Sequence, residues 1–98
     1  MTSRERIIKA INHQEPDRVP IDIGGTRVTG ISAEAYIRLR NYLKLNTKIP
    51  RVFDVYQMLA EVEEPIQQRL NLDVVSLNSL EVVFGIKNKD WKKWKFRE

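Results

Sequence analysis

The first apolar residues of the chain are three isoleucines at helical spacing: Ile7, Ile8 and Ile11. Thr2 precedes them and Glu5 follows Thr2 by three residues, which is the capping-box spacing that begins a helix. This pattern predicts a short amphipathic helix that ends near Asn12. Its charged residues are expected to face water: Arg4, Arg6 and Lys9. We expect His13, at the helix exit, to have a capping or packing role rather than a catalytic one.

The next apolar stretch alternates with polar residues, which is typical of a strand. Its apolar side chains are separated by single residues: Val19, Ile21 and Ile23. The alternation predicts a short strand over 19–23 that ends at Gly24 in a Gly-Gly turn. Asp17 and Arg18 stand in the turn before this strand, and we expect them to form a structural charge pair.

Further helix signals follow. Ser32 is an N-cap for a helix whose buried face holds an aromatic residue and two leucines: Tyr36, Leu39 and Leu43. Asp54 is expected to cap a third helix with an apolar stripe: Val55, Met58, Leu59 and Val62. Because an interior proline costs a helix about 3 kcal/mol, we place a break before Pro65. Glu63 then caps a new short helix that tolerates Pro65 in its first turn, with Asn71 in the left-handed conformation at its end.

Two more apolar runs are predicted to be strands, over 73–77 and 82–84. Helices followed by buried strands are typical of an α/β fold. The tail KNKDWKKWKFRE then interleaves aromatic residues with lysines. We expect Trp94 and Phe96 to share one face of a further strand.

Composition narrows the possible chemistry. The chain has 98 residues, no cysteine and one histidine, so disulfides, thiolate metal sites and a cysteine nucleophile are excluded within it, and a histidine-built zinc site is not expected. No apolar run approaches the roughly 18 residues that a membrane span needs. The N-terminal residues are too polar for a signal peptide. We therefore expect a cytoplasmic protein with no membrane partner.

The net charge of +4 comes entirely from the last twelve residues. Residues 87–98 hold six basic and two acidic side chains, and subtracting them from the totals of 17 and 13 leaves eleven of each sign in the rest. Nucleic-acid or anionic-surface binding would therefore depend on this basic aromatic tail alone. We do not expect nucleic-acid binding, but a small polyanion-binding module remains an alternative function.

The turn after the first predicted strand offers the candidate substrate-binding residues: Asp22, Gly24, Gly25, Thr26 and Arg27. The sequence Gly-Gly-Thr-Arg matches neither of the common phosphate-binding patterns, GxGxxG and GxxxxGK[ST]. Arg27 is the best local candidate for binding a carboxylate, because its rigid fork of donors matches two oxygens at once. We expect the Asp22 side chain to face solvent rather than to line a pocket.

Four stretches, in order, resemble the opening of uroporphyrinogen decarboxylase-like proteins: RERIIKAINHQEPDRVPIDIGGT, TGISAEAYIRLRNYL, VFDVYQMLAEVEEPIQQRLNLDVVSL and WKKWK. Within that superfamily the chain is most similar to the branch of corrinoid-linked, methylcobalamin-type methyltransferases. The resemblance implies a (β/α)8 barrel with its site at the C-terminal mouth of the strands. It also implies a parent that uses zinc and a corrinoid to transfer a methyl group to a thiol or similar acceptor, with a small molecule or a corrinoid protein as substrate.

Two departures from the family limit what this chain can do. Decarboxylases carry several arginines after the first strand, whereas GGTRVTG supplies Arg27 alone, so a decarboxylase-type lyase is the less favoured parent. A complete barrel needs about 250 residues, so residues 1–98 are expected to be the N-terminal portion of an incomplete barrel domain. We expect this portion to have no catalytic residues, no metal site and no activity alone. Its open sheet edges favour self-association or a partner chain that completes it.

Overall fold

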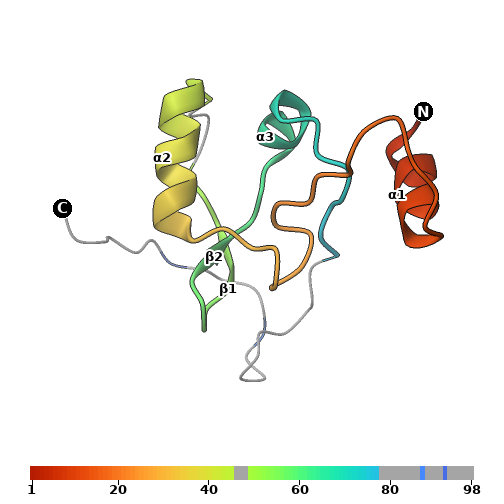
Figure 1. The fold of residues 1–98 in the computed structure, drawn as a ribbon. Helices are drawn as coiled ribbons and strands as arrows, with labels where there is room; N and C mark the ends of the chain where they lie inside the picture. Colours follow the sequence, from red (N-terminus) through yellow and green to blue (C-terminus); the bar gives the residue numbers. More distant parts are fainter. Residues whose placement is uncertain (46–48, 78–86, 88–91, 93–98) are drawn as a thin grey trace.

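The computed structural model describes residues 1–45 and 49–77, together with 87 and 92. These residues contain three helices and two short strands: α1 (Ser3–Ile11), α2 (Ala33–Leu43), β1 (Val52–Asp54), β2 (Leu59–Ala60) and α3 (Glu64–Arg69). Figure 1 shows α1 at one end of the molecule and α2 toward the other, with α3 between them and the β1–β2 hairpin beside α2. This mixture agrees with the α/β class at a coarse level. None of the helices in the described residues has the length and apolar character needed to cross a bilayer.

Helix α1 begins through the predicted capping box. The Thr2 hydroxyl accepts a hydrogen bond from the Glu5 N–H at 3.2 Å, and the Glu5 carboxylate accepts one from the Thr2 N–H at 2.7 Å. The bond from the Thr2 backbone lowers the pKa of Glu5. The expected orientation of the helix was wrong, however. Arg6 is buried, whereas Ile8 and Ile11 are 45% and 70% exposed, because Arg6 turns inward toward two carboxylates.

His13 follows the end of α1 with a left-handed φ of +56°. Its side chain is exposed, which agrees with a structural role at the helix exit. Because this conformation disfavours any residue with a Cβ, we expect His13→Gly to raise the free energy of unfolding by about 0.5–1 kcal/mol. The urea midpoint at an unchanged slope measures this gain. His13→Val is the matched control and should lower stability; a loss of stability in His13→Gly as well would contradict the prediction.

Helix α2 supplies the centre of the core. Ser32 caps it as predicted, accepting the Ala35 N–H at 3.3 Å. Among the described residues, the core consists of five buried side chains: Ala33, Tyr36, Ala60, Val62 and Ile66. Leu39 and Leu43 pack against this core, so the predicted apolar face is confirmed. Arg40, which we expected on another face, is only 5% exposed, because it pairs with a buried carboxylate.

The prediction of a third helix over 54–62 is wrong. This stretch forms the antiparallel β1–β2 hairpin, with Val52 opposite Ala60 and an irregular register before Asp54. Asp54 does act as a cap, but of a turn: its Oδ1 accepts the N–H of Tyr56 at 2.9 Å and of Gln57 at 3.3 Å. Met58 closes this turn with a φ of +53°.

Pairing with a distant segment explains why the hairpin forms instead of a helix. The N–H of Ala60 donates to the Ile31 carbonyl at 2.9 Å, and the N–H of Ala33 donates to the Met58 carbonyl at 2.8 Å. In a helix, these backbone groups would bond to one another along the helix. Here they bond to the chain before α2, which stabilises the extended hairpin instead. Such a contact has no local sequence signal.

Helix α3 agrees with the prediction for its start and its end. Glu63 is the N-cap residue and Pro65 lies in the first turn, where its missing N–H costs little. The Glu63 side chain makes no capping hydrogen bond. Asn71 takes the expected left-handed conformation, with a φ of +52°.

The predicted strands over 19–23 and 73–77 are extended segments, and neither is a strand in the described structure. Asp73 donates its N–H to the Ile21 carbonyl at 2.9 Å, but the Ile21 N–H bonds to the Asp73 side chain instead of continuing a ladder. Val19, expected on a buried face, is 79% exposed. The predicted strand over 82–84 and the aromatic residues of the tail lie outside the described residues.

Candidate functional site

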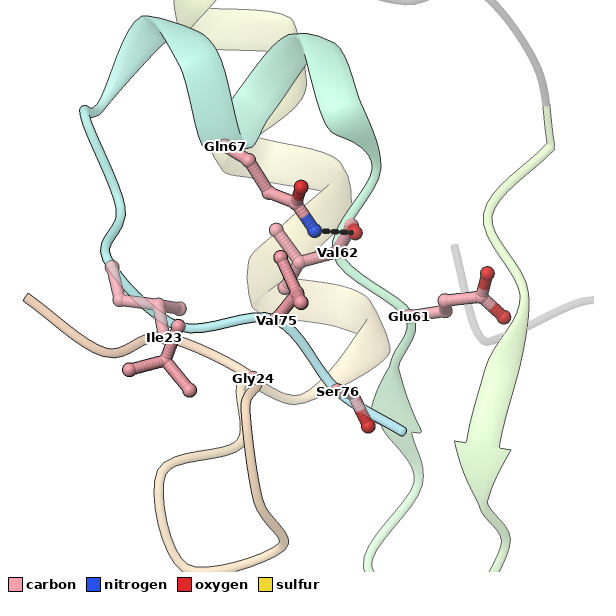
Figure 2. A pocket seen from close by; sticks show the side chains of 8 residues that line it. Ile23, Gly24, Glu61, Val62, Gln67, Val75 and Ser76 are labelled. Carbon is pink, nitrogen blue, oxygen red and sulfur yellow. Dashed lines mark hydrogen bonds between the residues drawn. The ribbon is translucent and has the colours of Figure 1, made fainter. Parts of the chain in front are cut away.

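Two extended segments run side by side in the same direction at the centre of the molecule. Asp73 contacts Ile21 through the backbone bond at 2.9 Å. Farther along both segments, Val75 and Ser76 line the same cavity as Ile23 and Gly24. Figure 2 shows this parallel course, with Val75 beside Ile23. Chain segments 52 positions apart therefore meet at one place.

The cavity between these segments has a volume of about 90 Å³. It is lined by residues of the two segments, of the chain after β2 and of α3: Ile23, Gly24, Glu61, Val62, Gln67, Val74, Val75 and Ser76. The Gln67 amide donates to the Val62 carbonyl at 3.0 Å, as Figure 2 shows, and the Glu61 carboxylate extends away from Gly24. The volume suits about three water molecules, so the cavity is too small for a substrate as it stands.

The loop of residues 24–29 is closed by its own hydrogen bonds. Asp22 accepts the Gly25 N–H through Oδ1 at 2.9 Å. The hydroxyls of Thr26 and Thr29 lie 3.0 Å apart, and each accepts the backbone N–H of the other residue, at 3.2 and 3.0 Å. Asp22 therefore shapes the loop instead of facing only solvent.

Both glycines of this loop lie against apolar side chains. Gly24 has a φ of +83°, and a Cβ there would be 2.5 Å from Cγ2 of Val62. A Cβ on Gly25 would collide with Cγ1 of Val74. The glycines thus allow the loop to pack closely on the chain after β2 and on the 73–77 segment.

Arg27 lies in the loop and faces the hairpin. Its Nε is 3.1 Å from Oδ2 of Asp54, whose side chain is 2% exposed, while the Arg27 side chain is 46% exposed. The Arg27 charge is therefore balanced by a buried carboxylate. Of the five predicted substrate-binding residues, Gly24 lines the cavity, and the others lie in or beside the loop next to it.

A buried charge cluster that the sequence did not predict is centred on Asp73. Its side chain is fully buried and accepts Ser3 Oγ at 2.8 Å, Arg6 Nη1 at 2.5 Å and Arg18 Nη1 at 2.7 Å. Asp17 bonds to Arg6 at 2.6 Å. The expected Asp17–Arg18 pair is therefore replaced by two longer-range pairs, because a buried carboxylate needs several donors at once.

These contacts shift the pKa values of both carboxyl groups. Burial by itself would raise the pKa of Asp73, but the Ile21 N–H, the Ser3 hydroxyl and the two arginines together lower it well below its usual value. The hydrogen bonds from Arg6 lower the pKa of Asp17 to about 2. The same bonds raise the pKa of Arg6 further above its ordinary value. All three groups are charged across the physiological range.

A second buried cluster joins α2 to the start of α3. Arg40 Nη1 lies 2.6 Å from Oε1 of Glu63, and both side chains are less than 10% exposed. The Tyr36 hydroxyl donates to Glu63 Oε1 at 3.1 Å and accepts the Glu63 N–H at 2.9 Å. Burial raises the pKa of Tyr36 to about 12. This cluster holds two elements together.

The described residues contain no group of three or more potential metal-ligating side chains. No family model, curated protein or solved structure matches the chain.

Proposed function

We propose that residues 1–98 are the N-terminal portion of a uroporphyrinogen decarboxylase-like (β/α)8 barrel, and that the complete protein is a corrinoid-dependent methyltransferase acting on a thiol or similar acceptor. The observation that carries this proposal is the parallel course of segments 21–24 and 73–76. Helix α2, the β1–β2 hairpin and helix α3 lie in the chain between them. Parallel neighbours connected through helices are the repeating unit of such barrels.

In this proposal the 24–29 loop follows the first barrel strand, at the mouth where substrates bind. Arg27 would bind an anionic group of the substrate through donors other than the Nε that faces Asp54. Asp22, Gly24, Gly25 and Thr26 would fix the shape of the loop around it. Asp54 holds the Arg27 Nε and would thereby fix the direction of the remaining guanidinium donors.

Zinc and a corrinoid are implied by the resemblance and not by this chain's residues. The family's methyltransferases use histidine and cysteine as zinc ligands, whereas the chain has one histidine and no cysteine. The residues present therefore do not fit such a zinc site, and no reaction step is assigned to them. Both groups would be held by other parts of the complete protein.

The test uses the native protein that carries these residues. We expect a product of about 250 residues or more that consumes methylcobalamin in the presence of a small thiol, followed by corrinoid absorbance. Arg27→Lys should reduce kcat/KM about tenfold, because lysine cannot bind two oxygens bidentately. Arg38→Lys is the matched control: Arg38 is an exposed arginine on α2 that pairs with Glu34 one turn away, and activity should not change.

Two results would overturn the proposal. Consumption of uroporphyrinogen in place of methylcobalamin would assign the parent to the decarboxylases. A native product of 98 residues that binds polyanions with a steep salt dependence would identify a binding module that uses the basic tail.

A further inference from the structure

Helix α1 leaves two of its three isoleucines exposed, while Ile7 is half-buried. Ile8 and Ile11 are 45% and 70% exposed, and Arg6 is its one buried residue. The core and the apolar residues packed against it include side chains from α2, the hairpin, α3 and the connecting segments, but no residue of α1. Figure 1 shows α1 standing apart from those elements.

Polar contacts through two side chains attach α1 to the rest of the chain. Arg6 bonds to Asp17 at 2.6 Å and to Asp73 at 2.5 Å, and Ser3 bonds to Asp73 at 2.8 Å. Asp17 follows α1 closely in sequence, so Asp73 provides the connection to the distant part of the molecule. Arg6 donates to both carboxylates and therefore dominates the attachment.

This arrangement separates the stability of α1 from that of the core. Burial of apolar area couples elements into one cooperative unit, whereas no residue of α1 belongs to the apolar core as far as the described residues form it. A helix of nine residues is unstable alone in water. Loss of the Arg6 contacts would therefore both undock α1 and unwind it, with the core intact.

We infer that α1 is an arm that undocks from the molecule as a separate unit, held in place by Arg6. Undocking separates the walls of an open groove of about 510 Å³, with Met1, Ser3 and Arg6 on the α1 side and Glu64, Gln67 and Gln68 on the α3 side. This inference does not depend on the methyltransferase proposal.

Amide hydrogen exchange of the 98-residue chain tests it, with Arg6→Gln compared with wild type. We expect amides of residues 7–12 to exchange on the order of 30-fold faster in Arg6→Gln, while the α2 amides of residues 36–43 keep their wild-type rates. Arg4→Gln changes an exposed arginine of the same helix and should leave both sets of rates unchanged.

Two outcomes would overturn the inference. Unchanged protection of residues 7–12 in Arg6→Gln would show that other contacts hold α1. Equal loss of protection in α1 and α2 would show that α1 belongs to the cooperative core. Neither outcome bears on methyl transfer, which is measured separately.

Discussion

Asp73→Asn lowers the free energy of unfolding by about 3 kcal/mol, the expected cost of breaking a buried pair by removing one charge. The fully buried carboxylate accepts from Arg6, from Arg18 and from the Ile21 N–H. An asparagine of the same shape would turn an N–H₂ group toward some of these donors, leaving them without an acceptor. Urea unfolding followed by circular dichroism measures the loss.

Asp17→Asn is the control for this substitution, because Asp17 also bonds to Arg6 but its side chain is 44% exposed. Water can replace the lost acceptor there, so we expect a clearly smaller change in the urea midpoint. Equal losses in the two variants would contradict the central role of Asp73 and would indicate that Arg6 alone determines the effect.

The same carboxylates determine the response to acid. Their folded-state pKa values are lowered, to about 2 for Asp17 and lower still for Asp73. A group whose pKa is lower in the folded state contributes stability above its unfolded pKa, about 4, and loses it as the pH falls through the folded value. Wild type should therefore lose stability steadily below pH 4, and Asp73→Asn should show a shallower loss. Identical acid profiles would show that Asp73 is not the responsible group.

Glu63→Ala has the second large expected effect, again a loss of about 3 kcal/mol. Arg40 would keep a buried positive charge without its carboxylate partner at 2.6 Å, and the Tyr36 hydroxyl would lose an acceptor. Glu63 is the N-cap residue with extended backbone, where alanine is not favoured, so the substitution brings no gain in helix propensity that would offset this loss. Thermal and urea unfolding measure the change.

Glu64→Ala is the matched control for this prediction. Glu64 is the next residue, is exposed, and accepts a hydrogen bond from Gln68 at 2.9 Å on the surface of α3. We expect a change in the free energy of unfolding within about 0.5 kcal/mol.

The double variant Arg40→Leu, Glu63→Leu separates the effect of charge from that of packing. Replacing both partners by apolar residues should recover much of the stability lost in Glu63→Ala. A double variant as unstable as Glu63→Ala would contradict the charge explanation.

The candidate site was predicted in part. The glycine loop and Arg27 were identified from the sequence, because a Gly-Gly turn after an apolar alternation marks a position where the backbone changes direction. Which groups face them was not predictable. Arg27 meets Asp54 from the hairpin, and Gly25 packs on Val74 from the segment after α3. These neighbours come from parts of the chain with no recognisable link to the loop in sequence.

The sequence by itself determined where each helix of the described residues begins and where α1 and α3 end. The Thr2–Glu5 capping box, the Ser32 cap and the left-handed Asn71 each depend on atoms within a few residues, so local rules were sufficient. The tertiary structure decided the hairpin over 52–60, the lack of a strand ladder at 19–23 and the burial of Arg6. Arg6 meets Asp73 across 67 positions, and the hairpin pairs with the chain before α2. These contacts form only when folding brings distant partners together, because a buried charge or backbone group must have its hydrogen bonds satisfied.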